Sequence, residues 1–148
     1  MGLFDAIDTA ATGLSAERLR MDVTAENLAN AQTTKGADGK PYQRKVVELQ
    51  QAGAGSGFGA ALNGAIKGGS GGAAGVRVAG ITADTTPNRL VYDPGHPDAD
   101  ARGYVSMPNV QPVTEMVDLI SASRGYEANV TVMQTAKQMF SKTLEILR

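Results

Sequence analysis

The side chains that could perform acid–base or metal chemistry are scarce in this chain. His96 is the only histidine and there is no cysteine, so a metal site would lack a second imidazole and any thiolate ligand. A catalytic triad would have to use His96, which is flanked by Pro94 and Pro97, and no serine occurs in a nucleophile-elbow pattern. We therefore interpret His96 as a structural loop residue and predict no catalytic residue.

Two stretches resemble ligand-binding motifs in part. The segment from Asp98 to Gly103, DADARG, resembles the start of a calcium loop, but Arg102 occupies the third acidic position and Asn109 replaces the bidentate glutamate. Asp and Gly also favour turns, so we predict a turn between strands. The glycine-rich run around Lys67 lacks the Gly-Lys-Ser/Thr ending of a phosphate loop. The sequence predicts no metal, cofactor or nucleotide site.

The overall composition restricts the functional class further. A length of 148 residues suits one or two small domains, and a net charge of −1 gives no electrostatic basis for binding nucleic acid or an anionic membrane. No apolar run approaches the roughly 20 residues that span a bilayer. Because the first basic residue is Arg18, we expect no cleaved signal peptide if the protein is exported.

Two long segments show helical periodicity, about residues 4–30 and 113–147. Apolar residues recur at seven-residue intervals in both, which predicts long helices that pair as a coiled coil. Lys137 interrupts the second pattern, and Pro112 precedes the first turn of that helix. The predicted packing residues are Ile7, Leu14, Met21, Leu28, Leu119, Tyr126, Val130, Met133, Phe140, Leu144 and Leu147.

The middle of the chain has a different pattern. Residues 42–50, 76–81, 89–92 and 104–107 are rich in β-branched and aromatic side chains and are predicted to be short strands. Residues 53–75 are dominated by Gly, Ala and Ser, which predicts a flexible loop or insertion. The expected fold is therefore α+β. Residues 1–34 and 112–148 would form a helical domain, and residues 35–111 would form a β-rich region that includes 53–75.

The two apolar stripes allow two interpretations. They could form the ordinary core of one chain, or they could bind neighbouring subunits. The β-rich middle is too small to cover two stripes of about 40 and 50 Å, and small residues such as Ala10, Ala11 and Ala25 permit close approach of a third helix. We favour packing between subunits.

Five strings in the sequence resemble bacterial flagellar axial proteins, the family of rod, hook and hook-associated proteins. ENLANAQTT with PYQRKVV is similar to the N-terminal motif of that family, and SRGYEAN is similar to its C-terminal motif. VYDPGHPDAD and GYVSMPNV resemble the proximal-rod members in particular. The residues that carry the resemblance are Asn27, Ala29, Asn30, Thr33, Tyr92, Pro94, His96, Pro97, Asp98, Asp100, Gly103, Tyr104, Pro108, Asn109, Tyr126, Glu127 and Asn129.

This resemblance implies a structural subunit of the flagellar basal-body rod, which transmits motor torque across the periplasm. It implies that the terminal helices line the inner wall of a helical tube and that the β-rich middle forms an outer layer. The implied partners are further copies of the chain, the rod proteins FlgB, FlgF and FlgG, the FliE junction and the MS ring. Export would use the flagellar type III apparatus without signal cleavage, and neither nucleic acid nor a small-molecule substrate is implied.

Two other functions compete with this one. A small secreted effector or adaptor could use a helical hairpin to bind one partner in a one-to-one complex, and an enzyme could have a cryptic site at His96. The sequence also leaves open whether Asn27 bonds within its own chain or to a neighbouring subunit. Asn30 is expected to end the first helix, either by satisfying exposed carbonyls or by adopting a left-handed conformation.

Overall fold

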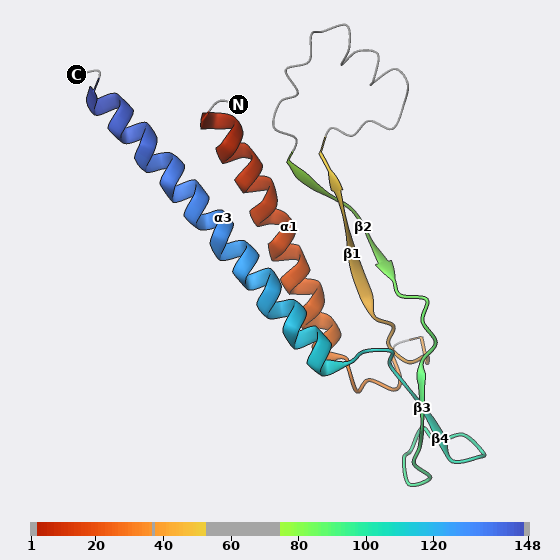
Figure 1. Cartoon of the computed structure of the whole chain (residues 1–148). Coiled ribbons are helices and arrows are strands. Elements are labelled where there is room, and N and C mark those ends of the chain that lie inside the picture. Colours follow the sequence, from red (N-terminus) through yellow and green to blue (C-terminus); the bar gives the residue numbers. More distant parts are fainter. Residues whose placement is uncertain (1–2, 37, 53–74, 147–148) are drawn as a thin grey trace, which may run out of the picture. The chain divides into compact units, whose positions relative to one another are not determined.

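The computed structural model describes residues 3–36, 38–52 and 75–146. The order of its elements is α1 (Leu3–Ala29), β1 (Lys45–Gln51), β2 (Val76–Ala83), β3 (Arg89–Tyr92), β4 (Tyr104–Met107) and α3 (Pro112–Ile146) (Figure 1). The predicted α+β class is confirmed, and β3 and β4 have the predicted bounds. The prediction of a flexible loop falls almost wholly on residues outside the described part of the chain, as does Leu147.

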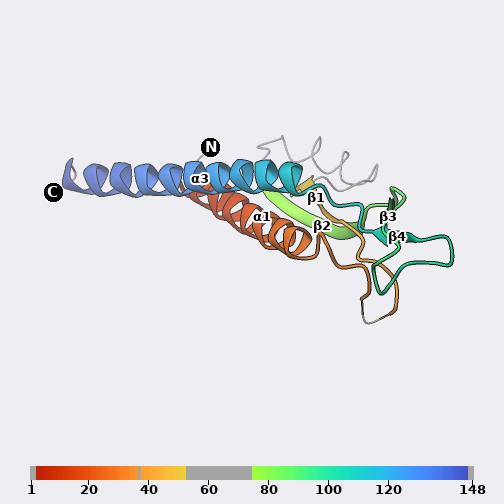
Figure 2. The same cartoon turned by 90° about the horizontal axis from the view of Figure 1, so that it is seen from below.

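Local residues explain where α3 begins and where α1 ends. Pro112 is the first residue of α3, where its missing N–H costs no helical hydrogen bond, and α3 then continues without interruption (Figure 2). At the end of α1, the Asn30 amide donates to the Glu26 carbonyl at 2.9 Å. The predicted role of Asn30 in satisfying a carbonyl is confirmed. The left-handed alternative is wrong, since Gly39 and Gly103 are the residues with positive φ in the described chain.

The strands form two small sheets. β1 pairs with β2, and β3 pairs with β4 in a second sheet. The β3–β4 pair is antiparallel, with Leu90 opposite Ser106 and Tyr92 opposite Tyr104. Because side chains alternate across a strand, Val91 and Val105 lie on the other face of this hairpin. Val105 is buried, so that face packs against the protein core.

The described chain divides into two compact units. Unit 1 comprises Met1–Arg18, Glu48–Ala79 and Ser123–Arg148, and unit 2 comprises Leu19–Val47 and Gly80–Ala122. Each unit thus combines parts of both helices with residues of the strands. The division expected from the sequence, into a helical domain and a β-rich region, stays a prediction. In the described residues no helix is both long and apolar enough to cross a membrane.

Within unit 1, α1 and α3 run antiparallel and approach each other closely at two glycines. Glu17 lies against Gly125 and Gly13 lies against the Asn129 side chain. Farther along, Phe4 meets the edge of Phe140 with 5.9 Å between ring centroids. The buried alanines of this unit are Ala10, Ala16 and Ala136. The two helices therefore lie side by side in this unit. Their pairing as a coiled coil through the seven-residue series stays a prediction.

Candidate assembly site: a buried polar cluster and exposed apolar faces

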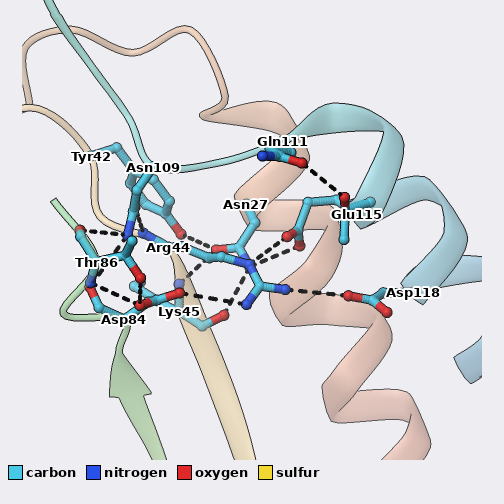
Figure 3. Close-up of polar contacts among 11 residues, drawn as sticks. Asn27, Tyr42, Arg44, Lys45, Asp84, Thr86, Asn109, Gln111, Glu115 and Asp118 are labelled. Carbon is cyan, nitrogen blue, oxygen red and sulfur yellow. Dashed lines mark hydrogen bonds and ion pairs between the residues drawn. The ribbon is translucent and has the colours of Figure 1, made fainter. Parts of the chain in front are cut away.

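Unit 2 contains a polar cluster where α1 ends and α3 begins (Figure 3). Asn27 and Glu115 lie at its centre, and each is only 1% exposed. Buried polar groups of this kind are costly unless they are hydrogen-bonded. The other members of this polar cluster are Tyr42, Arg44, Lys45, Asp84, Thr86, Asn109, Gln111 and Asp118.

The Asn27 amide uses its full hydrogen-bonding capacity within the chain. Its Nδ2 donates to the Lys45 carbonyl at 2.8 Å and to Glu115 Oε2 at 3.1 Å. Its Oδ1 accepts from the Lys45 N–H and from the Tyr42 hydroxyl, both at 2.9 Å. Asn27 therefore bonds within its own chain. Its hydrogen bonds hold Tyr42 and Lys45, the first residue of β1, against the end of α1.

Arg44 supplies the charge that the buried Glu115 carboxylate needs. Its Nε donates to Glu115 Oε1 at 2.6 Å, and one terminal nitrogen donates to Asp118 at 3.3 Å. The other terminal nitrogen lies 3.8 Å from Asp84. The hydrogen bond to Glu115 has the largest effect and raises the pKa of Arg44. Burial acts in the opposite direction, and the negative charges of the three carboxylates raise the pKa further. The guanidinium thus joins the first turns of α3 to the segments beside it.

Asn109 connects the same region to the end of β2. Its Oδ1 accepts from the Arg44 N–H at 2.8 Å, and its Nδ2 donates to the Thr86 carbonyl at 3.1 Å. The Thr86 hydroxyl and N–H both donate to the Asp84 carboxylate and lower the pKa of Asp84. Asn109 was predicted only as a motif residue, and these bonds give it a structural role.

Tyr42 has the most perturbed ionisation in the polar cluster. Burial, followed by repulsion from Glu26 and Glu115, raises the pKa of Tyr42 to about 12. The neutral phenol is therefore favoured, and this is the form that donates to Asn27. The hydrogen bonds of the polar cluster are made within the chain, and they connect the end of α1, the start of β1, the end of β2 and the start of α3.

The motif residues around His96 form a structured turn at the tip of the β3–β4 hairpin. His96 Nδ1 accepts from the Asp98 N–H at 3.1 Å. The Thr34 hydroxyl donates to Asp98 at 2.8 Å and lowers the pKa of Asp98, with Lys35 contributing less. Asp100 Oδ1 accepts from the N–H groups of Arg102 and Tyr104. The predicted turn is confirmed.

The remaining motif residues lie apart from the polar cluster or at its edge. In the N-terminal motif, the Thr33 hydroxyl bonds the Asn30 side chain at 3.2 Å, while Ala29 is exposed. In the C-terminal motif, Tyr126 is half-buried and Glu127 is exposed. The other members are placed as follows: Pro94 lies against Gly103, Pro97 is exposed, Pro108 is buried, Tyr92 contacts Tyr104, and Asn129 contacts α1.

Two exposed apolar faces complete the candidate site, and both belong to unit 2. The α3 apolar face consists of Val113, Met116, Val117 and Ile120, which are between 45% and 70% exposed. The hairpin face consists of Leu90, Tyr92 and Tyr104, which are 67%, 65% and 43% exposed. Apolar patches of this kind on a folded surface mark interaction sites.

The predicted packing residues have mixed exposure. Those of α1 and most of those of α3 are half-buried, while Phe140 and Leu144 are exposed. Whether they contact other subunits stays a prediction. The predicted packing residues do not include the α3 apolar face, although its i, i+3, i+4, i+7 spacing is visible in the sequence. Arg44 and Glu115 were also missed, because nothing local indicates a pairing across 71 residues.

Comparison with known proteins identifies the family. Residues 7–37 match the model described as "Flagella basal body rod protein", and residues 101–146 match "Flagellar basal body rod FlgEFG protein C-terminal". The flagellar basal-body rod protein FlgC of Bacillus subtilis is 48% identical over 150 residues, covering 99% of both chains. The FlgC proteins of Borreliella burgdorferi and Salmonella typhimurium are 46% and 44% identical, and both alignments cover at least 98% of either chain.

The chain belongs to the FlgC family of flagellar basal-body rod proteins. It is a structural subunit of the bacterial flagellar basal-body rod, and its cellular place is the basal body. The resemblance drawn from these five strings is confirmed at the level of the family.

Proposed function

We propose that the chain forms part of the proximal rod, where its terminal helices build the wall of a helical tube and its β-rich region lies farther out. Rotation of such a tube would carry motor torque across the periplasm. The observation that supports this most strongly is the apolar surface that α3 leaves exposed. In unit 1 this surface includes Val132, Met139, Phe140 and Leu144. Side chains of this size gain stability when a neighbouring helix removes them from water.

The predicted packing residues fit the same proposal. Ile7, Leu14, Met133 and the other half-buried members could complete their burial against helices of adjacent copies in coiled-coil fashion. An interface that uses different surfaces on its two sides does not close on itself and generates a helical filament. Continued addition of subunits would then give a tube whose stiffness comes from helix packing.

The proposed partners are further copies of the chain, FlgB, FlgF and FlgG in the rod, and the FliE junction and MS ring at its base. We also propose export by the flagellar type III apparatus without a cleaved signal. Helices that reach full burial only after assembly suit this route, because a chain that is less ordered beforehand enters a narrow channel more readily.

Substitution of an exposed apolar residue tests the proposal. Val132→Asp should prevent recovery of the chain in purified basal bodies and abolish swimming, because a charge would be buried without a partner in the tube wall. Gln134→Asp is the matched control, since Gln134 is also exposed on α3 but polar, and it should assemble. Normal assembly of Val132→Asp would contradict burial of this face. A soluble one-to-one complex in place of basal-body incorporation would favour the adaptor function.

A further inference from the structure

The hairpin face is an apolar surface that the fold itself does not require. The register pairs Leu90 with Ser106 and Tyr92 with Tyr104, while the opposite side of the hairpin supplies the buried Val105. The two tyrosine rings meet edge to face with centroids 5.3 Å apart. Each ring therefore restricts the other, which lowers the entropy that a partner would have to remove on binding.

The turn beyond the hairpin holds this surface in one conformation. Gly103 has a φ of +79°, and a Cβ at this position would lie 3.0 Å from the Tyr92 ring. Asp100 closes the turn by accepting two backbone N–H groups. Tyrosine on a rigid support is the residue type that dominates the energetics of many protein interfaces.

The size of the hairpin face indicates what kind of partner it takes. Its three side chains offer on the order of 300 Å², which is less than the roughly 800 Å² per partner of a stable isolated complex. The contact would therefore form only among other contacts, as it does for a subunit held by many neighbours. This favours an occupant inside the rod over a freely diffusing partner.

Unit 2 itself carries a surface of matching extent and chemistry. From Val113 to Ile120 a helix rises about 10 Å, and the four paired residues of β3 cover about the same length. The α3 apolar face consists of aliphatic side chains and Met116, and the hairpin face of one leucine and two tyrosines, residue types that suit the apolar centre of a protein interface. Two different complementary surfaces on one chain are what a non-closing, repeating contact needs.

We propose that the hairpin face of one subunit docks onto the α3 apolar face of a second copy of this chain. This inference rests on the proposed rod function and names the surfaces through which neighbouring copies meet. Leu90 and Tyr92 would contact Val117 and its neighbours, and the contact would repeat from copy to copy.

A charge-exchange experiment in cells tests this contact. Leu90→Lys alone and Val117→Glu alone should each reduce the number of subunits recovered per basal body about tenfold. The double variant should recover to within about twofold of the unsubstituted chain, because the two new charges attract across the interface. Leu90→Lys with Thr114→Glu is the matched control and should not recover, since Thr114 is exposed on α3 but outside the α3 apolar face.

The outcomes separate the inference from the function on which it rests. Absence of the unsubstituted chain from basal bodies would contradict the rod function itself. Normal assembly of Leu90→Lys would overturn the hairpin face as an interface. Loss of assembly in both single variants without recovery in the double variant would overturn a second copy as the occupant. Unchanged urea unfolding of the isolated variants, followed by tyrosine fluorescence, confirms that folding is intact.

Discussion

The two units are stabilised by different kinds of interaction. In unit 1 the two helices approach each other closely at small residues and share an edge-to-face aromatic contact. Unit 2 is held by a buried network in which Asn27 and Glu115 are fully bonded. From this difference we propose that unit 2 is ordered in a single chain, whereas unit 1 depends more on neighbouring subunits.

Removal of the Arg44 guanidinium should have the largest effect on unit 2. Arg44→Ala leaves the buried Glu115 carboxylate without its cation and should lower the free energy of unfolding by about 3–5 kcal/mol. Urea unfolding followed by tyrosine fluorescence measures this, because Tyr42, Tyr92 and Tyr104 belong to unit 2 and the chain has no tryptophan.

Two variants sharpen this test. Lys45→Ala removes the exposed ion pair with Glu26 and should cost no more than about 1 kcal/mol. Adding Glu115→Gln to Arg44→Ala should restore part of the loss, because no buried charge then remains. Equal effects of Arg44→Ala and Lys45→Ala would show that the polar cluster does not dominate the stability of unit 2.

Asn27→Ala should have the next largest effect. It leaves the Tyr42 hydroxyl, both Lys45 backbone groups and one Glu115 oxygen without a shared partner, which should cost about 1–3 kcal/mol. The same unfolding measurement applies, with Asn30→Ala as a control because the Asn30 amide bond is exposed. A smaller loss for Asn27→Ala than for Asn30→Ala would contradict the assigned role of Asn27.

Gly103→Ala tests how rigidly unit 2 holds its hairpin. An L-residue at a φ of +79° and a Cβ 3.0 Å from the Tyr92 ring should together cost about 1–2 kcal/mol. Gly80→Ala is a suitable control, since a Cβ there meets nothing within 4 Å. Proton chemical shifts of the Tyr92 ring would show whether the hairpin face has moved. A Gly103→Ala protein as stable as Gly80→Ala would argue against this rigidity.

The ionisation of Tyr42 predicts a stability change confined to alkaline pH. Its pKa is about 12 in the folded protein against 10.0 for an ordinary tyrosine. Above pH 10 the unfolded chain releases this proton and the folded chain does not, so the contribution to stability should fall between pH 10 and 12. Tyr42→Phe should flatten this part of the pH profile, and an unchanged profile would contradict the assignment.

The smallest predicted effect lies in unit 1. A Cβ on Gly13 would lie 2.9 Å from the Asn129 amide nitrogen, so Gly13→Ala alone should change helix stability little. With Asn129→Ala added, the gain in helix propensity should appear as about 0.5–1 kcal/mol. A thermal melt followed by circular dichroism measures both variants. Full stabilisation by Gly13→Ala alone would show that the two helices are not in close contact here.

The sequence predicted what depends on local pattern and missed what depends on distant pairing. The helices and the β3–β4 hairpin follow from periodicity and turn residues, and their bounds agree with the structure to within a few residues. Asn27 and Arg44 both bond to Glu115. The three residues come from distant segments, and no local sequence pattern predicts their contact. Nothing in the local sequence around Glu115 indicates that the fold buries it completely.

The helix seam illustrates the same limit. A strict seven-residue repeat selected large residues such as Leu14 and Met133, while within one chain Gly13 and Gly125 also approach the facing helix closely. Periodicity identifies which positions share a helix face, and it does not say which face meets the same chain and which meets another copy. That distinction needed the exposure of each side chain in the folded subunit.

Amide hydrogen exchange, compared between the isolated subunit and purified basal bodies, tests the central claim most directly. We predict that the amides of residues 19–36 and 104–122 in unit 2 are protected in both states. Those of residues 123–146 in α3 should exchange rapidly in the isolated subunit and slowly in the rod. Equal protection of residues 123–146 in both states would contradict the claim that neighbouring subunits complete this part of the structure.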